Sequence, residues 1–434
     1  MILQFTVSNM CSFNEPQTLD LRAVKTCKER RDEASVVLFP GTRFADERAL
    51  KTIAIYGANA SGKTNLLRAM HFFMTMVRQS SVGGQVGNLI PVQPFLYADR
   101  GNMPGPSGFE MVFSIGNMVY RYGFKATFQN VVEEWLFVKD MVMDRVVEKE
   151  LFVRFQDGEK DDIRVSKSFS GVDNTIITKT RRNALFLSTC ANLAVPEATT
   201  IVGSVFANMA MYSAEWMRYD YTAEFCKTDN GAKRVLDFLQ KTDPTIGLIE
   251  VESVPDEPRM GLTTWHRSQS RFNVKIRPKR IGGGVYDDGL ALDAIASSGT
   301  QRAFVLAGPM LDILDKGGLL VVDELDCRLH PILVRQIIRL FNSKASNPNN
   351  AQLVFNTHDT NLLNDKVYDS QKGKYEPLLR RDEIYFTERS QSFATRLYSL
   401  AEFKKEGKGV RSDASYEKDY LQGLYGAIPF IGEL

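Results

Sequence analysis

The stretch that decides the fold is Gly57-Ala58-Asn59-Ala60-Ser61-Gly62-Lys63-Thr64. A strand-like, mostly apolar run precedes it at positions 51–56, and a helical pattern continues after it. Strand, loop and helix in this order are the setting of a phosphate-binding loop, in which backbone N–H groups and a helix N-terminus converge on an anion. Lys63 then reaches the β- and γ-phosphates, and the Thr64 hydroxyl is offered to Mg²⁺. The sequence therefore predicts a site for ATP and Mg²⁺ that uses Gly57, Asn59, Ser61, Gly62, Lys63, Thr64 and Asn65.

Composition sets the class of protein but not its partner. The chain has 434 residues, with 54 basic and 52 acidic side chains and a formal charge of +2. A balance this close to neutral neither demands nor excludes nucleic acid. The five cysteines form no C-x-x-C pair, which argues against a zinc site and a disulfide framework. No signal peptide or membrane-length apolar run is recognisable, so we expect a cytoplasmic protein without a membrane partner.

The pattern along the chain predicts an α/β fold made of five segments. Residues 1–95 hold a hairpin over 2–24, the phosphate loop and a helix from Lys63 to about Arg78. Residues 96–175 alternate with period two and are expected to form an antiparallel β subdomain. Residues 176–284 are interpreted as a mixed insertion that favours helix over about 183–241, with Met209 and Met211 among the helical positions, and strands over 247–253 and 271–277. Residues 285–400 complete the nucleotide-binding core, and residues 401–434 form a tail suited to oligomer or effector contacts.

Two buried strands in the C-terminal third end in polar residues. The apolar run 319–322 is typical of a central parallel strand and leads into Asp323 and Glu324. An NTPase needs a carboxylate for Mg²⁺ and a group that orients the attacking water, so we assign Asp323 to the metal and Glu324 to the water. A second strand over 352–355 precedes His358, which is placed to contact the γ-phosphate and the water. The alternative for each residue is a solvated strand end or a structural histidine.

Two weaker signals complete the expected site. Gln93 lies in the proline-bounded stretch 91–94, from which a glutamine could reach Mg²⁺ and the γ-phosphate, although a surface loop is the alternative. The turn at 297–301 precedes an apolar helix expected over 302–314. Pro309 falls inside that helix, where it predicts a kink or a restart.

The order of these motifs resembles that of ABC-type ATPases, which carry a Walker A loop, a serine-glycine signature, a Walker B glutamate, a D-loop aspartate and a switch histidine. Ser298, Gly299 and Gln301 match the signature and Asp326 the D-loop, whereas Thr300 replaces the usual second glycine and Ser297 the usual leucine. The Leu-His-Pro run at 329–331 and the long insertion are similar to the SMC-like and OLD-like branch, of the AAA15 and AAA21 types.

That resemblance implies a function and a set of partners. In the family, ATP is sandwiched between two subunits, so Ser298, Gly299, Gln301 and Asp326 would serve the nucleotide in a homo-oligomer of ATP-sandwich dimers or a higher ring. The chain also resembles ATPases of prokaryotic anti-phage defence, such as abortive-infection ATPases and the AriA ATPases of PARIS systems. This implies an oligomeric scaffold that senses a phage-encoded trigger protein. The chain after His358 is too short for the nuclease domain of OLD-like enzymes, so a separate effector nuclease or toxin of the AriB kind is expected.

The alternative is an SMC-like DNA-repair or chromosome ATPase that acts directly on DNA. It rests on short basic clusters at 181–182, 277–280, 380–381 and 404–405. Clusters of this length are usually solvated surface, and the insertion lacks the heptads of a coiled-coil arm. Nucleic acid is therefore possible but not required. A transporter motor ranks third, because it would need a separate permease.

Overall fold

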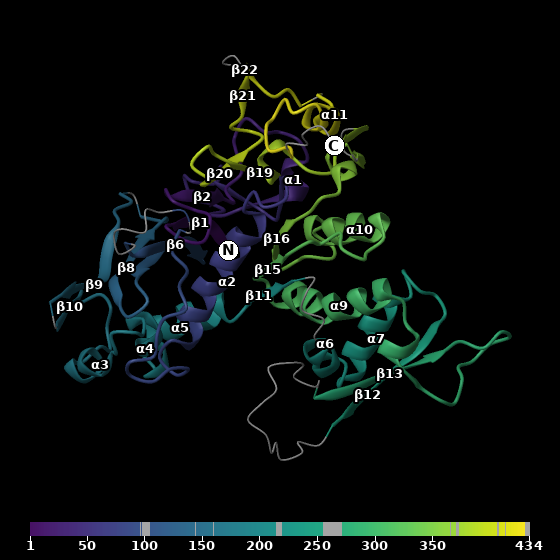
Figure 1. Ribbon diagram of the computed structural model, residues 1–434, viewed down its shortest axis with the longest axis horizontal. Helices are drawn as coiled ribbons and strands as arrows, with labels where there is room; N and C mark the ends of the chain where they lie inside the picture. Colours follow the sequence, from purple (N-terminus) through teal and green to yellow (C-terminus); the bar gives the residue numbers. More distant parts are fainter. Residues whose placement is uncertain are drawn as a thin grey trace.

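Two large sheets and the helices between and beside them make up the protein. The computed structural model describes residues 1–95, 97, 105–143, 145–158, 160–213, 219–254, 271–364, 366–369, 373–405, 408–412 and 414–429. One sheet has seven strands and the other has six. In Figure 1 the seven-stranded sheet lies on the left, and helices α9 (Ser298–Lys316) and α10 (Pro331–Asn342) lie on the right. The predicted mixed α/β fold is confirmed.

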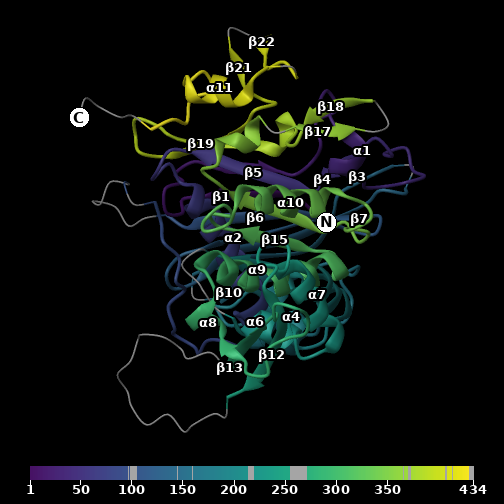
Figure 2. The same cartoon turned by 90° about the vertical axis from the view of Figure 1, so that its right-hand side faces the viewer.

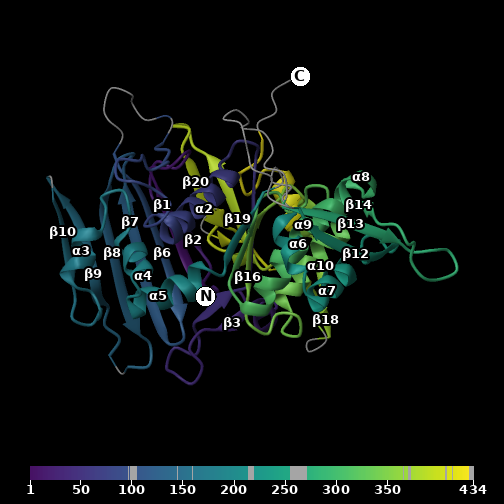
Figure 3. The same cartoon turned by 90° about the horizontal axis from the view of Figure 1, so that it is seen from below.

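The seven-stranded sheet is antiparallel and has the order β10-β9-β8-β7-β6-β1-β2. Its strands lie side by side in Figure 3. They are β1 (Ile2–Ser8), β2 (Gln17–Asp20), β6 (Ser107–Ile115), β7 (Met118–Ala126), β8 (Val131–Asp140), β9 (Lys149–Asp157) and β10 (Lys160–Val165). The hairpin expected at the N-terminus is present, with a second strand shorter than predicted, and it joins this sheet because β1 pairs with β6. A division of the chain at residue 95 therefore separates strands of one sheet.

The six-stranded core sheet has the order β11-β15-β16-β5-β19-β20. Neighbouring strands from β11 to β19 are parallel, and β20 is antiparallel to β19. Strands β5, β15 and β16 are buried along their whole length, as the apolar runs predicted. The strands are β5 (Thr52–Gly57), β11 (Met209–Tyr212), β15 (Leu319–Val322), β16 (Gln352–Asn356), β19 (Ile384–Arg389) and β20 (Thr395–Ser399).

Strand β11 corrects the prediction that Met209 and Met211 lie in helices. The segment pairs in parallel with β15, with Met209 opposite Leu319 and Tyr212 opposite Val322. Periodicity cannot separate helix from strand over so few residues, and the open edge of β15 offers the hydrogen bonds that decide between them. Part of the presumed insertion thus completes the core sheet.

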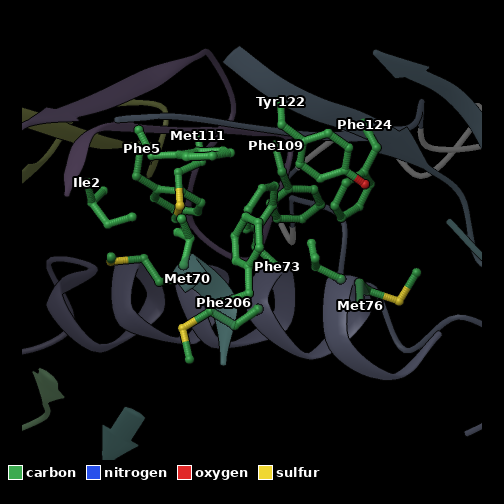
Figure 4. Close-up of a cluster of buried hydrophobic side chains, with 14 of the residues drawn as sticks. Ile2, Phe5, Met70, Phe73, Met76, Phe109, Met111, Tyr122, Phe124 and Phe206 are labelled. Atoms are coloured by element: carbon green, nitrogen blue, oxygen red, sulfur yellow. The ribbon is translucent and has the colours of Figure 1, made fainter. Parts of the chain in front are cut away.

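Helix α2 (Lys63–Gln79), which confirms the predicted helix, lies between the two sheets. Its Phe73 ring stacks on Phe124 of β7, with centroids 5.4 Å apart, and meets Phe5 of β1 at 5.7 Å. Figure 4 shows Phe73 pointing from the helix into this aromatic cluster. Ile53 and Val321 of the core sheet belong to the same buried cluster. The helix that carries the phosphate loop is therefore fixed on two sides.

Alternate residues of the core strands face a second buried cluster. Ala54 and Leu320, next to Ile53 and Val321 in the chain, pack in the cluster that contains the apolar faces of α9 and α10. These two helices stand in front of the core sheet in Figure 2. The period of two along each strand thus supplies two separate cores from one sheet.

The remaining elements are short. Helices α3 (Asn174–Lys179), α4 (Phe186–Asn192), α5 (Pro196–Ile201) and the π-helical turn η1 (Val202–Phe206) precede β11. A small lobe follows it, with α6 (Asp220–Phe225), α7 (Asp229–Leu239), α8 (Leu292–Ile295) and a sheet of β12 (Ile246–Ser253), β13 (Phe272–Pro278) and β14 (Leu290–Ala291). Elsewhere lie α1 (Arg31–Ala34), α11 (Tyr416–Leu421), the 3₁₀ turns η2 (Thr360–Leu363) and η3 (Arg381–Glu383), and the pairs β3 (Ser35–Val37) with β4 (Arg48–Leu50), β17 (Lys366–Asp369) with β18 (Lys374–Pro377), and β21 (Lys404–Lys405) with β22 (Lys408–Gly409). Among the described helices, none combines the length and apolarity needed to cross a bilayer.

Helix α9 runs through Pro309 without the restart that the sequence suggested. Proline cannot donate to the carbonyl four residues earlier, which is that of Val305. The Thr222 hydroxyl of α6 donates to this carbonyl at 3.2 Å and accepts from the Gly308 N–H at 3.1 Å. A side chain on Gly308 would collide with Thr222, so the glycine allows the close approach. The helix is continuous because a neighbouring hydroxyl replaces the missing bond.

Replacing Thr222 with valine keeps the volume but removes this hydroxyl. Two buried backbone groups of α9 would lose their partner, so we expect the free energy of unfolding to fall by about 1–3 kcal/mol. Chemical denaturation would measure the change. Thr178→Val is the control, because that exposed hydroxyl also bonds to helical carbonyls. Equal stabilities for the two variants would contradict this account of the helix.

Candidate functional site

The carboxyl ends of the parallel strands bring the predicted residues to one edge of the core sheet. Strand β5 leads into the phosphate loop, β15 into Asp323, and β16 ends at Asn356. The Lys63 side chain is only 6% exposed, and its ammonium donates to the carbonyls of Gly57 at 2.7 Å and Ala58 at 3.0 Å. The Lys63 ammonium is therefore bound to carbonyls of the phosphate loop, and the oxygens of a bound phosphate would compete with these carbonyls for its hydrogen bonds.

Buried hydroxyls support the phosphate loop from the side opposite its binding face. The Ser61 hydroxyl lies 2.6 Å from that of Thr387, and the Thr395 hydroxyl is within 2.8 Å of both the Ser61 carbonyl and the Ser12 hydroxyl. Gly62 has a φ of 110°, and a side chain there would collide with Thr395. The loop keeps its shape because strands β19 and β20 and the N-terminal turn pack directly against it.

The side chains predicted to hold Mg²⁺ meet directly. The Thr64 hydroxyl donates to Oδ1 of Asp323 at 3.0 Å, and Asp323 is 6% exposed. A hydroxyl and a carboxylate are the hard oxygen ligands that Mg²⁺ prefers, with its other positions filled by water and phosphate. Among the described residues, no group of three or more His, Cys, Asp or Glu side chains is placed to hold a metal alone. The residues fit a metal ion that shares its ligands with a nucleotide.

Glu324, Asp326 and His358 gather beside this pair. Glu324 has a φ of 52°, which is unusual for a residue other than glycine and turns the chain sharply after β15. Asp326 accepts a hydrogen bond from the backbone N–H of His358 at 3.3 Å. Desolvation lowers the pKa of His358, and the charge of Lys63 lowers it further, which favours a neutral imidazole. The predicted D-loop and switch residues thus lie together within one chain.

The signature residues form the first turn of α9, one turn earlier than the predicted start at residue 302. Ser297 caps the helix by accepting from the Thr300 N–H at 3.1 Å, and Ser298 is exposed. A side chain on Gly299 would approach the Arg328 carbonyl to 2.7 Å. In the part of the chain that the structure describes, no hydrogen bond joins Ser298 or Gly299 to the phosphate loop. The role of this turn toward a nucleotide stays a prediction.

Other predicted residues are occupied by contacts within the chain. The Gln301 amide accepts from the Tyr219 hydroxyl at 3.0 Å and donates to the Ala296 carbonyl at 3.0 Å. Gln93 accepts from the Cys11 thiol at 3.6 Å, and its carbonyl accepts from the Cys11 N–H. Both side chains are thus engaged within the chain, and their roles toward a nucleotide or Mg²⁺ stay predictions.

Asn59 and Asn65 differ in their surroundings. Asn59 is exposed at the crest of the phosphate loop. The Asn65 amide donates to the Ser12 hydroxyl at 2.9 Å, which ties the first turn of α2 to the N-terminal turn. Asn65 thus supports the loop through its side chain.

Sequence reasoning missed Asn356, although a signal was present. A polar residue at the end of a buried parallel strand lies at the same edge as the other site residues. Its amide donates to Asp323 and accepts from the Glu324 N–H. The roles of Ser12 and Thr395 had no such signal, because each comes from a distant hairpin that only the fold places under the loop.

Two segments of the chain match a known protein family. Residues 53–162 and 280–364 match the family described as "AAA domain, putative AbiEii toxin, Type IV TA system". The matched parts contain the phosphate loop, the signature turn, Asp323 with Glu324, and His358. The fold is mixed α/β, with the phosphate loop placed between β5 of the core sheet and α2.

Two solved structures that are similar to this chain are SMC heads. The SMC head domain from Thermotoga maritima shares 11% identity, with 92% of this chain and 98% of that chain covered at a TM-score of 0.38. The SMC head bound to the C-winged helix domain of ScpA shares 12% identity, with 92% and 97% covered at a TM-score of 0.43. A search of the curated proteins found no match.

Lys63 of the phosphate loop predicts a pH dependence of nucleotide binding. Burial lowers the pKa of Lys63 to about 8, although the nearby carboxylates of Glu324, Asp323 and Asp326 oppose the shift. A bound triphosphate favours the protonated form, so ATP binding above about pH 8 should take up a proton and weaken as the pH rises.

Titration calorimetry at about pH 8.5, in two buffers of different ionisation enthalpy, would detect this uptake because Lys63 then exists partly in its neutral form. Lys63→Arg is the control, since a guanidinium stays protonated throughout this range. Equal apparent enthalpies for the wild-type chain in the two buffers would rule out the shifted lysine.

Proposed function

We propose that the chain is a Mg²⁺-dependent ATPase, that two copies close around ATP, and that this assembly controls a separate toxic effector in a prokaryotic anti-phage defence system. The observation that carries the proposal is the contact of Thr64 with Asp323 directly above the phosphate loop. Only a metal-bound triphosphate uses the loop, the lysine, the hydroxyl and the carboxylate together.

The arrangement supports hydrolysis of the terminal phosphate. Water would attack the γ-phosphorus, the bond to the bridging oxygen of ADP would break, and the Glu324 carboxylate would accept the proton of the water. Bound Mg²⁺ supplies charge neutralisation on the phosphate oxygens. Lys63 would bind the phosphates, and the neutral imidazole of His358 can accept or donate a hydrogen bond at the water.

Each chain offers an incomplete set of contacts to the γ-phosphate. The Ser298 turn is an exposed helix N-terminus, with backbone N–H groups and a hydroxyl suited to an anion. Since no hydrogen bond joins this turn to the phosphate loop among the described residues, a second copy is the natural source of the anion that it binds. ATP-dependent association follows from this division of the site.

The defence role rests on the family description and on the resemblance in sequence. The matching family is described by a toxin and a toxin–antitoxin system. We extend that description to this chain as a sensor and scaffold of the PARIS or abortive-infection type, with a phage-encoded trigger and an effector nuclease of the AriB kind as partners. The C-terminal segment after residue 400 is the proposed contact surface.

Direct action on DNA gains little from the structure, because the arginines of three of the four basic clusters, at 181–182, 277–280 and 380–381, already have partners within the chain. Their arginines bond to carboxylates or backbone carbonyls of the same chain: Arg181 to Ser80, Arg182 to Asp161, Arg277 to Glu250, Arg280 to Asp287, Arg380 to Asp382 and Arg381 to Glu29. Neutralised side chains release few counterions on a phosphate backbone. The protein-controlling role therefore ranks above the DNA-acting one.

Glu324→Gln should bind ATP and Mg²⁺, lose at least about 10²-fold in turnover, and accumulate as a dimer, because the water loses its proton acceptor while the nucleotide contacts remain. Multi-angle light scattering with and without ATP would show the dimer. Adding Ser298→Arg to this variant should return it to a monomer that still binds ATP. A Glu324→Gln chain that remains monomeric at saturating ATP would overturn the sandwich.

Cells that carry this chain with its neighbouring reading frames should resist phage, and Lys63→Ala should remove that resistance by abolishing nucleotide binding. Plaque counts would measure the protection. Thr178→Val, an exposed change far from the loop, is the matched control. Full protection by the Lys63→Ala chain would separate any defence role from ATP.

A further inference from the structure

We propose that Asn356 and Arg302 are positioning residues that clamp the peptide group between Asp323 and Glu324, and so set the metal ligand and the proton acceptor together. The inference rests on the ATPase activity proposed above. It assigns a role to two fully buried polar side chains that lie outside the recognised motifs.

The clamp holds one peptide unit from two sides. The carbonyl of Asp323 accepts from the guanidinium of Arg302 at 3.3 Å. The N–H of Glu324, which belongs to the same peptide unit, donates to Oδ1 of Asn356 at 2.5 Å. With its C=O and N–H both engaged, this peptide cannot rotate without breaking a buried hydrogen bond.

A fixed peptide matters here because Glu324 adopts a left-handed conformation. Its φ of 52° lies in the left-handed region, which is strained for a residue other than glycine. The same peptide in its ordinary orientation would point the Glu324 side chain along a different direction from the end of β15. The clamp therefore offsets strain that is stored at the residue expected to activate water.

Asn356 connects this peptide to the metal pair. Its amide nitrogen donates to Oδ1 of Asp323 at 2.5 Å, and the same oxygen accepts from the Thr64 hydroxyl. Its own carbonyl accepts from the Leu325 N–H at 3.1 Å. One asparagine thus contacts three successive residues of the turn, and a change at the metal carboxylate acts directly on the peptide of Glu324.

Arg302 connects the clamp to the signature turn. It lies one turn after Ser298 in α9 and also donates to the Ser213 carbonyl at 2.8 Å. Among the described residues, its Nε–H finds no hydrogen-bond partner, although the side chain is completely buried. Burying a guanidinium with an unpaired donor is costly, and structures retain such groups where position matters more than stability. Because Arg302 is in the same helix as Ser298, a shift of this helix caused by a contact at Ser298 would act on the Asp323 carbonyl through Arg302.

Asn347, in the loop between α10 and β16, provides a matched control for Asn356 at the end of β16. It is also fully buried, and its amide makes three hydrogen bonds, with Phe341 and with both backbone groups of Ala351. These bonds fasten the opposite end of β16, far from the phosphate loop. The loss of stability in an Asn347 variant therefore measures what a buried side-chain amide contributes to folding, separately from any effect on turnover.

The test compares Asn356→Asp, Asn356→Ser, Arg302→Lys and Asn347→Ser in the full chain. We expect the two Asn356 variants to lose about 10–100-fold in kcat, as partners of metal ligands typically do. Asn356→Asp should also raise the Mg²⁺ concentration needed for half-maximal turnover, because its carboxylate cannot donate to Asp323. Binding of ATP without Mg²⁺ should be unchanged, since the loop and Lys63 are untouched.

Arg302→Lys should lower kcat without weakening Mg²⁺-free ATP binding, because a lysine cannot reach both carbonyls in the same geometry. Asn347→Ser should lower the melting temperature and leave kcat and the Mg²⁺ requirement unchanged in the folded fraction. Wild-type kcat and Mg²⁺ dependence in Asn356→Asp would overturn the inference while the ATPase stands. A wild-type chain that binds ATP but never turns it over would overturn both proposals.

Discussion

Parallel pairing of β5, β15 and β16 is the constraint on which the rest of the structure depends. The register places Phe355 beside both Val322 and Ala54, so the three strands end at one level and direct the phosphate loop, Asp323 and Asn356 to the same edge. A shift of one residue in any strand would exchange the side chains that face the two buried clusters, each packed against different helices. Thr64 and Asp323 meet because the register of buried strands leaves them no other position.

The two faces of this sheet pack against different helices, and each helix positions a different part of the site. One face packs on α2, and α2 packs on the antiparallel sheet through Phe73, which fixes the phosphate loop relative to the N-terminal hairpin. The other face packs on α9 and α10, which fixes the signature turn relative to Asp323 through Arg302. Displacing either helix would disturb a buried core, so the site is rigid at the level of the backbone.

A rigid core with an incomplete site accounts for the proposed dependence on assembly. In the proposed assembly, the chain would contribute the loop, Thr64, Asp323 and the Glu324 carboxylate to one nucleotide, and the exposed turn at Ser298 to another. Bound nucleotide can therefore stabilise the dimer of two copies, and hydrolysis of the nucleotide can allow the dimer to dissociate. A scaffold of this kind can hold or free an effector without any catalytic residue of its own for the effector's substrate.

The sequence by itself determined the phosphate loop, the helix after it, the buried strands before Asp323 and His358, and the antiparallel strands of residues 96–175. Each has a local signal: a motif with fixed spacing, an unbroken apolar run, or a clear period. Only the tertiary structure decided that Met209–Tyr212 is an edge strand of the core and that α9 continues through Pro309. It also decided that Ser12 and Thr395 contact the phosphate loop and that Asn356 and Arg302 contact the peptide between Asp323 and Glu324. Each of these outcomes depends on a partner more than 20 residues away in sequence: the edge of β15 for β11, the Thr222 hydroxyl for α9, and the Asp323 peptide group for Arg302. No local sequence pattern encodes which distant group a buried polar atom will contact.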